Sequence, residues 1–193
     1  MSARLAPFIV FCGIDGCGKT SAIKAVGEKF PTVDTTREPG GTPLAENIRN
    51  LLLSEKGGIL SPLEQMHLFF AGRHIHIHER ILPKRKSGIP VVSDRFDGST
   101  FAFQRCLSLV AEKIEINQPL YEEFFRLREQ VVHHCEPSLY IYLEVDPVIG
   151  MRRRAFAREQ ELNHFDLANI EEQKRRAVSY RTFFKHIRTR GIS

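Results

Sequence analysis

Pro7-Phe-Ile-Val-Phe-Cys12, followed directly by Gly13-Ile-Asp-Gly-Cys-Gly-Lys-Thr20, decides the fold of this chain. The first run is apolar and rich in β-forming residues, and the residues from Gly18 to about Lys29 read as a helix. Strand, glycine loop and helix in this order are the context that the pattern Gly-x4-Gly-Lys-Ser/Thr requires. We therefore predict a phosphate-binding loop for a nucleoside triphosphate. The alternative is a glycine-rich turn with a surface lysine.

Each residue type in this loop has a chemical reason to be there. Glycines let the backbone curl so that successive N–H groups point at phosphate oxygens, and the helix N-terminus adds positive potential. Lys19 is expected to neutralise the β and γ phosphates of ATP, and the Thr20 hydroxyl to ligate Mg²⁺. The predicted nucleotide-binding residues are Gly13, Ile14, Asp15, Gly16, Cys17, Gly18, Lys19 and Thr20.

The composition is that of an ordinary globular domain. Of 193 residues, 42% are hydrophobic and 26% are charged, which excludes disordered, collagen-like and membrane-spanning classes and predicts one domain over 1–193. The net charge of +5 favours anionic partners, among which nucleotides, nucleic acid and anionic lipid stay open. Four cysteines without a Cys-x-x-Cys pair, and no visible export signal, favour a reducing cytoplasm.

The rest of the chain alternates strands with helices. We expect further strands at 32–36, 90–93 and 139–145, and helices over 44–52, 61–82, from Pro147 onward and over 167–190. Ser61, with Pro62 at the first helical position and Glu64 at the third, predicts a capped start for the second of these helices. Such alternation implies a parallel sheet flanked by helices, an α/β fold.

Two further motifs make the chain resemble the thymidylate kinases, which are P-loop nucleoside monophosphate kinases. They are Thr36-Arg-Glu-Pro-Gly-Gly-Thr42 and Asp94-Arg-Phe-Asp-Gly-Ser-Thr-Phe-Ala-Phe-Gln104, and the resemblance runs from about Pro7 to about Ser179. It implies a three-layer P-loop fold with strand order 2-3-1-4. It also implies a Mg²⁺-dependent transfer of the γ-phosphoryl group of ATP to dTMP, giving dTDP, by a cytoplasmic homodimer, in the host cytoplasm if the source is viral.

The resemblance also assigns contacts to the acceptor's sugar and phosphate. Asp15 is expected to accept the 3′-hydroxyl, while Arg49 and Arg95 clamp the monophosphate, because a guanidinium fork matches phosphate oxygens. The alternatives are a turn carboxylate for Asp15 and a solvated helix face for Arg49. The implied acceptor-binding residues are Asp15, Glu38, Pro39, Arg49, Phe69, Arg73, Arg95, Ser99, Thr100, Phe103 and Gln104.

The acceptor's base is expected on the helix over 61–82. Phe69 and Arg73 are four residues apart, so they share a helix face, and in the family these positions stack on thymine and hydrogen-bond its edge. A core role is the alternative for Phe69. Thr100 and Gln104 repeat the four-residue spacing and look like the other base contacts.

A metal site and a lid complete the expected machinery. Asp94 follows a strand and is expected to hold Mg²⁺ through water, together with Thr20, with a helix N-cap as the alternative. Glu38 is a weaker candidate for metal or for loop ordering. The segment from Arg152 to Asp166 resembles the family's lid, and in families of this kind a catalytic arginine lies either in the phosphate loop or in the lid. Positions 14–17 carry no basic residue, so the resemblance implies that the lid over about 151–166 stabilises the transferring phosphoryl group, with Arg154 and Arg158 as candidates or else as a solvated basic face. The predicted catalytic residues are Lys19, Arg95, Arg154, Arg158 and Asp15.

Some positions depart from the family pattern. The lid reads Asn163-His-Phe-Asp166 in place of Asp-Arg-x-Glu, and the usually glycine-rich loop after Gln104 is not glycine-rich. Phe103 stands where tyrosine is common, which predicts looser exclusion of a 2′-hydroxyl. A fifth strand and final helix, whose connecting loop touches the donor adenine in relatives, are missing, which predicts weaker discrimination among donors if the short chain is natural.

Three other functions stay open. The first is a kinase for dUMP or a 5-substituted dUMP, and the second is a deoxynucleoside kinase, against which the 36–42 motif argues. The third is a nucleotide- or nucleic-acid-binding protein without phosphoryl transfer; we expect no stable nucleic-acid partner and no membrane partner. His74 and His78 share a helix face, but zinc is disfavoured because no further ligands are evident. The resemblance implies the dimer, and the 61–82 helix carries Leu63, Met66, Phe70 and Ile77, which is enough apolar surface for both a core and a partner helix.

Overall fold

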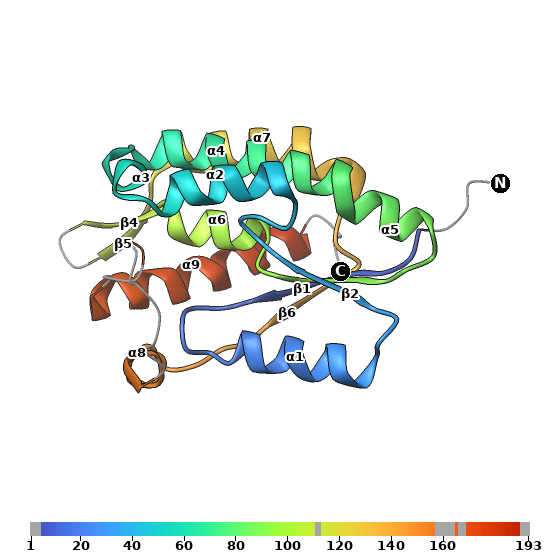
Figure 1. Cartoon of the computed structure of the whole chain (residues 1–193). Helices are drawn as coiled ribbons and strands as arrows, with labels where there is room; N and C mark the ends of the chain where they lie inside the picture. The colour runs from blue at the N-terminus through green and yellow to red at the C-terminus, as the bar shows by residue number, and fades with distance from the viewer. Residues whose placement is uncertain (1–4, 111–112, 157–164, 166–168, 190–193) are drawn as a thin grey trace.

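A four-stranded parallel sheet forms the centre of the molecule in the computed structural model, which describes residues 5–110, 113–156, 165 and 169–189 (Figure 1). Its strand order is β2-β3-β1-β6, as the resemblance implied, and no fifth strand joins it within these residues. Register pairs Phe8 with Val91 and Ile9 with Leu139. The strands are β1 Phe8–Cys12, β2 Asp34–Arg37, β3 Val91–Asp94 and β6 Leu139–Tyr142.

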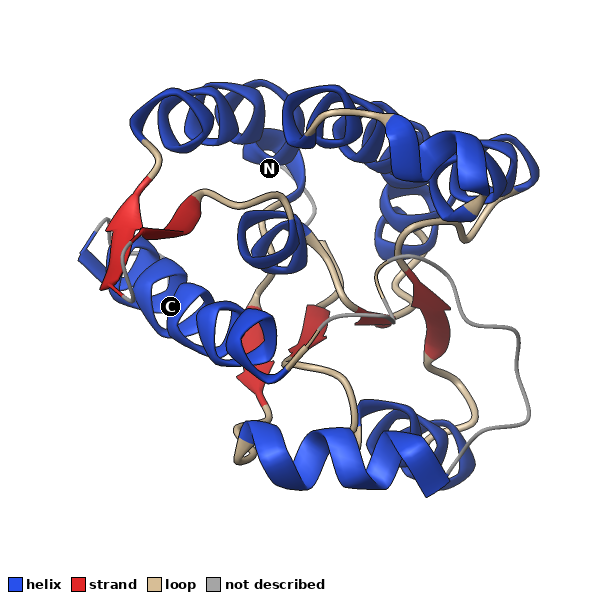
Figure 2. Ribbon diagram, turned by 90° about the vertical axis from the view of Figure 1, so that its left-hand side faces the viewer, coloured by secondary structure: helices blue, strands red, loops and turns tan. Residues whose placement is uncertain are grey.

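Helices cover both faces of the sheet, which makes three layers (Figures 1 and 2). Helix α1 lies on one face of the sheet, where Phe11, Ile23 and Val92 form a small core. The larger helical layer, which includes α4, α6, α7 and α9, covers the opposite face, where the large core lies. The helices are α1 Lys19–Lys29, α2 Pro43–Leu53, α3 Glu55–Ile59, α4 Pro62–His76, η1 Ile77–Ile81, α5 Leu82–Lys86, α6 Asp97–Phe103, α7 Gln118–Val132, η2 His133–Cys135, α8 Pro147–Phe156 and α9 Ile170–Thr189.

The long helix predicted over 61–82 is longer than expected and changes its winding. The Ser61 hydroxyl accepts a hydrogen bond from the Glu64 N–H, and the Glu64 carboxylate accepts one from the Ser61 N–H, so the predicted cap is confirmed. A π-helical turn, η1, then leads into α5, which continues to Lys86. Pro83 lacks an N–H donor and crowds the preceding turn, and a wider turn just before it relieves that conflict.

The strand predicted over 139–145 is shorter in the structure. β6 ends at Tyr142, and the Leu143 N–H still donates to the Cys12 carbonyl at 2.9 Å. The neighbouring strand β1 ends at Cys12, where Gly13 begins the phosphate loop, so residues beyond Leu143 have no strand to pair with.

An antiparallel hairpin was not predicted from the sequence. Strands β4 Leu107–Val110 and β5 Lys113–Ile116 pair with each other, and the Asn117 N–H closes their base by donating to the Cys106 carbonyl at 3.0 Å. They lie just after Gln104, where the resemblance implied a glycine-rich loop and this sequence departs from it. The departure thus coincides with a separate two-stranded sheet.

Helix α6 is the element that the rest of the large core surrounds. The Phe101 ring contacts the rings of Phe124 and Phe183 at centroid distances of 5.1 and 5.7 Å. Gly98 lies so close to Phe183 that an added Cβ would be 2.9 Å from its ring. Because α6 carries several predicted acceptor-binding residues, this packing fixes their positions between α4 and α9.

Cys12, Cys17, Cys106 and Cys135 are all free thiols. Burial raises the pKa of the Cys12 thiol well above its ordinary value, so this buried thiol is inert. None of the described helices is long and apolar enough to cross a membrane.

Candidate active site

The phosphate loop joins β1 to α1 and holds its lysine inward. The Lys19 ammonium group donates to the carbonyl oxygens of Gly13 and Ile14 at 3.0 and 2.9 Å, and only 6% of the residue is exposed. Gly16 and Gly18 have φ values of 74° and 96°, which only glycine adopts without strain. Burial and the nearby Arg95 lower the pKa of Lys19. The lysine thus lies at the loop with two carbonyl partners that phosphate oxygens can replace.

Asp15 is the point where cations from three parts of the chain meet. Its Oδ1 atom lies 2.5 Å from Arg95 and 3.4 Å from Arg154, and its Oδ2 atom lies 3.7 Å from Arg176. Burial alone would raise the pKa of Asp15, but these arginines and Lys19 hold it below its ordinary value. The carboxylate is therefore ionised and shared among arginines, in contrast to the turn carboxylate considered as the alternative.

Arg95 connects the phosphate loop to the C-terminal helix. Its Nη1 atom donates to the Gly13 carbonyl and to the Tyr180 hydroxyl, each at 3.1 Å, and the same hydroxyl lies 2.8 Å from the Ser99 hydroxyl. Burial alone would lower the pKa of Arg95, but Tyr180 and Asp15 raise it above its ordinary value. The Arg95 guanidinium thus bonds to the phosphate loop and to α9, and Tyr180 links it to Ser99 of α6.

The sequence did not point to Arg176 and Tyr180, both of which come from α9. The Arg176 guanidinium lies 4.1 Å from the centre of the Phe103 ring and donates to the Phe165 carbonyl at 3.1 Å. Burial lowers the pKa of Arg176 to about 10, which leaves it charged at neutral pH. Tyr180 shares an apolar stripe at helical spacing with Ala177, Phe183 and Ile187, a signal that could have placed it inside the protein, whereas no local pattern distinguishes Arg176 from a solvated arginine. Arg158, the second predicted lid arginine, lies outside the described residues.

Arg49 faces the loop that follows β2. It donates to the Pro39 carbonyl at 3.0 Å and lies 4.0 Å from the Glu46 carboxylate. Burial and the neighbouring Arg37 lower its pKa. This partly buried position differs from the solvated helix face that was the alternative for Arg49, and it places a guanidinium near Asp94 and Arg95.

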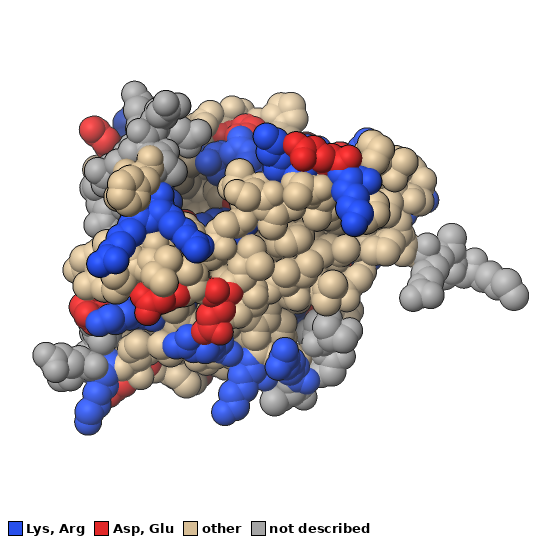
Figure 3. Space-filling view, turned by 90° about the horizontal axis from the view of Figure 1, so that it is seen from below, with Lys and Arg blue, Asp and Glu red and all other residues tan. Residues whose placement is uncertain are grey.

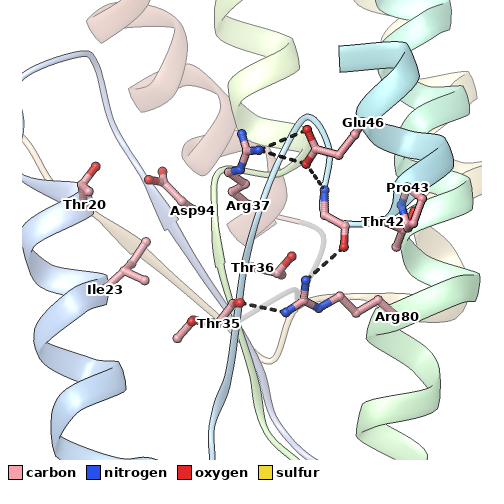
Figure 4. A pocket seen from close by; sticks show the side chains of 11 residues that line it. Thr20, Ile23, Thr35, Thr36, Arg37, Thr42, Pro43, Glu46, Arg80 and Asp94 are labelled. Carbon is pink, nitrogen blue, oxygen red and sulfur yellow. Dashed lines mark hydrogen bonds and ion pairs between the residues drawn. The ribbon is translucent and has the colours of Figure 1, made fainter. Parts of the chain in front are cut away.

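Asp94 ends β3 beside the phosphate loop. Its Oδ1 atom is buried without a hydrogen-bond partner, and the residue before α6 is Phe96, so Asp94 does not cap that helix. Asp94 and Thr20 both line a cavity of about 560 Å³, in which their side chains face one another (Figure 4). A carboxylate and a hydroxyl are oxygen ligands of the kind that Mg²⁺ prefers, so both residues fit the expected metal.

The far wall of this cavity is held by ion pairs. Arg37 donates to both carboxylate oxygens of Glu46, at 3.0 and 3.1 Å, and Glu46 also accepts from the Gly41 N–H at 2.9 Å (Figure 4). Arg80 donates to the carbonyls of Gly41 and Thr35, each at 3.0 Å. These bonds fix the turn between β2 and α2 that carries the Pro39 carbonyl to Arg49.

The predicted base contacts lie together between α4 and α6. Arg73 is 2% exposed, and it donates to Glu38 at 2.8 Å and to the Thr100 hydroxyl at 2.9 Å. Its Nη1 atom and the Nε2 atom of Gln104 are buried with no hydrogen-bond partner. Buried donors are almost always paired, so these two groups mark a place where a ligand's acceptor atoms belong. Glu38 is occupied by Arg73, which favours loop ordering over metal binding.

Aromatic rings lie around these side chains, and we call the site of Phe69, Arg73, Thr100, Phe103 and Gln104 the base pocket. Phe69 lies 6.0 Å from Phe165, and Phe103 also lies 6.0 Å from Phe165, measured between ring centres. Phe69 is half-buried at the pocket, whereas its neighbour Phe70 is 1% exposed and belongs to the large core. The core alternative therefore fits Phe70 and does not fit Phe69.

The histidines divide into two groups. His74 and His78 share a helix face as predicted, with ring centres 4.4 Å apart, and the described residues hold no group of three or more possible metal ligands among His, Cys, Asp and Glu. His76 is fully buried and contacts Thr36 and Glu38. The alternation of three histidines gave no indication that the middle one has a separate role.

Comparison with known proteins assigns the chain to a family. The sequence model of the thymidylate kinases matches residues 11–190. Thymidylate kinase of Geobacillus sp. (strain WCH70) is 36% identical over 170 residues, which are 84% of this chain and 75% of that protein. Thymidylate kinase of Clostridium novyi (strain NT) is 31% identical over 178 residues, which are 90% and 82% of the two chains. The crystal structure of thymidylate kinase from Ehrlichia chaffeensis superposes with a TM-score of 0.67 at 27% identity, covering 94% of this chain and 87% of the other. The chain belongs to the thymidylate kinase family.

Proposed function

We propose that this protein transfers the γ-phosphoryl group of ATP to dTMP and forms dTDP. The observation that carries the proposal is the pairing of Asp15, within the phosphate loop, with Arg95, within the acceptor motif. This ion pair joins the expected donor and acceptor sites into one unit. A protein that only binds a nucleoside triphosphate has no use for such a connection, nor for the unpartnered donors on Arg73 and Gln104.

Catalysis in this scheme consists of positioning and charge stabilisation. Lys19 leaves its two carbonyl partners for the donor's phosphates, and Arg95 and Arg49 bind the acceptor's phosphate. Arg154, from the lid helix α8, already lies beside Asp15 and supplies positive charge to the transferring group. Mg²⁺, held by Thr20 and through water by Asp94, supplies further neutralisation of the β and γ phosphates when bound. Arg158 stays a candidate for the same task.

The base pocket favours a pyrimidine with a carbonyl at its edge. The guanidinium of Arg73 and the amide nitrogen of Gln104 can only donate, so both require acceptor atoms. Phe69 offers a ring face for stacking, and Thr100 holds Arg73. A kinase for dUMP or a 5-substituted dUMP uses the same contacts, so these acceptors are the second candidate. A deoxynucleoside kinase would leave Arg49 and Arg95 without an acceptor phosphate.

We infer a single kinase domain over 1–193 with a lid over about 151–166, acting in a reducing cytoplasm. The four free thiols support that compartment. Basic and acidic side chains alternate on the face that Figure 3 shows, which does not suit a continuous nucleic-acid surface there.

We also infer a homodimer, for which the long helix leaves little apolar surface beyond the core. Met66, Phe70 and Ile77 are buried in the chain's own core, so of the four apolar residues named on the long helix only Leu63 is exposed. Leu44 and Leu51 are exposed on the neighbouring helix α2. These three leucines supply apolar surface for a second copy.

An acceptor panel tests the proposed reaction. The protein is incubated with Mg-ATP, and ADP release is followed with dTMP, dUMP, 5-hydroxymethyl-dUMP, thymidine or buffer alone. We expect turnover with dTMP well above that with thymidine and buffer. Equal turnover with all acceptors, or ATP hydrolysis that no acceptor stimulates, would contradict the proposal, and a preference for a substituted dUMP would favour the second candidate.

A further inference from the structure

A chain of four buried hydrogen bonds leads from β2 to the base pocket. The Thr36 hydroxyl lies 2.9 Å from Nε2 of His76, whose Nδ1 lies 3.1 Å from Glu38. The other Glu38 oxygen accepts from Arg73 at 2.8 Å, and Arg73 donates onward to the Thr100 hydroxyl at 2.9 Å. His76 is 0% exposed and Glu38 5%. We call Thr36, His76, Glu38 and Arg73 the positioning chain.

Chemistry fixes the direction of the bonds to Glu38. A carboxylate only accepts, so Nδ1 of the His76 ring carries a proton and donates it to Glu38. The other ring nitrogen, Nε2, shares a hydrogen bond with the Thr36 hydroxyl. Each Glu38 oxygen then has a fixed donor, one from His76 and one from Arg73. The carboxylate cannot rotate without breaking a buried bond.

Gly41 makes room for this arrangement. A Cβ atom added there would overlap both the His76 ring and the Thr36 hydroxyl. Gly41 also has a φ of 95°, in the region that favours glycine. The glycine pair after Pro39 therefore lets the backbone close over the histidine, which seals the positioning chain from water.

The positioning chain ends at Arg73, in which one guanidinium nitrogen has no hydrogen-bond partner in the described part of the protein. The Arg73 guanidinium lies between the rings of Phe70 and Phe96, 4.8 and 4.9 Å from their centres. Nε and Nη2 are bonded within the protein, and Nη1 is buried without a hydrogen-bond partner. Two rings and two hydrogen bonds thus determine where Nη1 points.

We propose that His76 is a positioning residue for acceptor recognition. Together with Thr36 it holds Glu38, and Glu38 aims Nη1 of Arg73 at a carbonyl oxygen of the acceptor's pyrimidine. This inference rests on the proposed function and deepens it. The fixed N–H group of Arg73 can donate a hydrogen bond to a carbonyl oxygen, whereas an amino group at the same edge of the base would have no partner. The positioning chain therefore sets the base specificity of the site.

Three variants test the positioning chain by steady-state kinetics with dTMP and ATP. Thr36→Val removes the hydroxyl at constant shape, His76→Leu removes both ring nitrogens, and His76→Asn retains a donor near Nδ1. We expect the first two to raise the KM for dTMP about 10-fold or more, with kcat and the KM for ATP within threefold of the unaltered protein. His76→Asn should have a KM for dTMP much closer to that of the unaltered protein, because it retains the donor. Thr32→Val is the matched control, because Thr32 is exposed in the turn that precedes the same strand and does not line the cavity.

Two further measurements separate positioning from general damage. Deoxyribose 5-phosphate, which has no base, is used as a competitive inhibitor, and its inhibition constant should be the same in all variants. In an Arg73→Ala background, Thr36→Val should change the KM for dTMP by less than twofold, because the residue through which it acts is gone. If His76→Leu does not fold, Thr36→Val carries the test.

The outcomes distinguish the two proposals. If the unaltered protein turns over dTMP but Thr36→Val leaves its KM unchanged, the positioning role is wrong and the proposed function stands. Equal weakening of dTMP and deoxyribose 5-phosphate would also overturn the positioning role, because it would indicate a general distortion. If the unaltered protein neither binds nor turns over dTMP, the proposed function fails, and the role of His76 fails with it.

Discussion

The base pocket and the cluster of charges around Asp15 are built on opposite principles. In the pocket, Glu38 and the Thr100 hydroxyl hold Arg73, His76 holds Glu38 in turn, and one guanidinium nitrogen is left for a ligand. Around Asp15, four cations, Lys19, Arg95, Arg154 and Arg176, lie near a single carboxylate. The pocket is ordered before a ligand arrives, whereas the cluster holds more positive charge than its carboxylate can neutralise. Selectivity therefore resides in the first region and phosphate chemistry in the second.

Lys19→Ala should break the charged region and leave the pocket intact. We expect kcat to fall about 10³-fold or more, because no other side chain replaces the ammonium group at the loop. Binding of dTMP, measured by calorimetry without ATP, should change less than threefold. Lys24→Ala, on an exposed part of the same helix, is the control and should be fully active. A highly active Lys19→Ala protein would refute the assignment of the loop.

Phe69→Ala should break the pocket and leave the charged region intact. Loss of base stacking is expected to raise the KM for dTMP about 20-fold, while kcat stays within threefold. Steady-state kinetics at saturating ATP measure both quantities. Phe30→Ala removes an exposed ring at the end of α1 and should have no effect. A fall in kcat with an unchanged KM would contradict the separation of the two regions.

Arg176→Met sharpens the comparison, because Arg176 contacts both regions. Its guanidinium lies beside Asp15 and over the Phe103 ring, so its loss should reduce kcat/KM for dTMP about 10-fold through both parameters. Arg181→Met, on an exposed part of the same helix, removes a solvated ion pair with Glu144 and should change kcat/KM less than twofold. Equal effects of the two variants would remove Arg176 from the site.

The smallest expected effect concerns stability. The surrounding cations hold the pKa of Asp15 below its ordinary value, so the ionised carboxylate stabilises the folded state. That contribution is complete above the ordinary carboxyl pKa and is lost as the pH falls through the lower, folded value. Asp15→Asn should therefore be less stable than the unaltered protein at pH 7, and the difference should shrink as the pH falls below about 4. Urea unfolding at a series of pH values measures it, and a difference independent of pH would exclude this linkage.

The sequence predicted the elements that have a local signature. The phosphate loop, the amphipathic helix α2 and the capped start of α4 each carry their own pattern, and the strand order came from the family resemblance. The hairpin also carries a pattern, since apolar Leu107 and Leu109 flank Ser108, and Ile114 and Ile116 flank Glu115, at the period of a strand, but each strand is only four residues long.

The contributions of α9 could not be predicted in the same way. Arg175 and Arg176 lie in a run of charged residues, yet both are almost fully buried, as is Tyr180 one turn further along. Arg175 donates to the Leu107 carbonyl at the base of the hairpin, and Tyr180 contacts Arg95, more than 80 residues earlier in the chain. A buried charge of this kind depends on partners that only the folded chain brings near.

The sharing of one carboxylate by several arginines has a further consequence for the end of the catalytic cycle. ADP and dTDP, the products of the proposed reaction, are polyanions, and the charge that gathers the substrates retains the products equally. Departure is then the electrostatically difficult step, and Asp15, by competing for the arginines, lowers the affinity of the phosphates that must leave. Added salt should accordingly speed product release while it slows substrate capture, so turnover and capture respond to ionic strength with opposite signs.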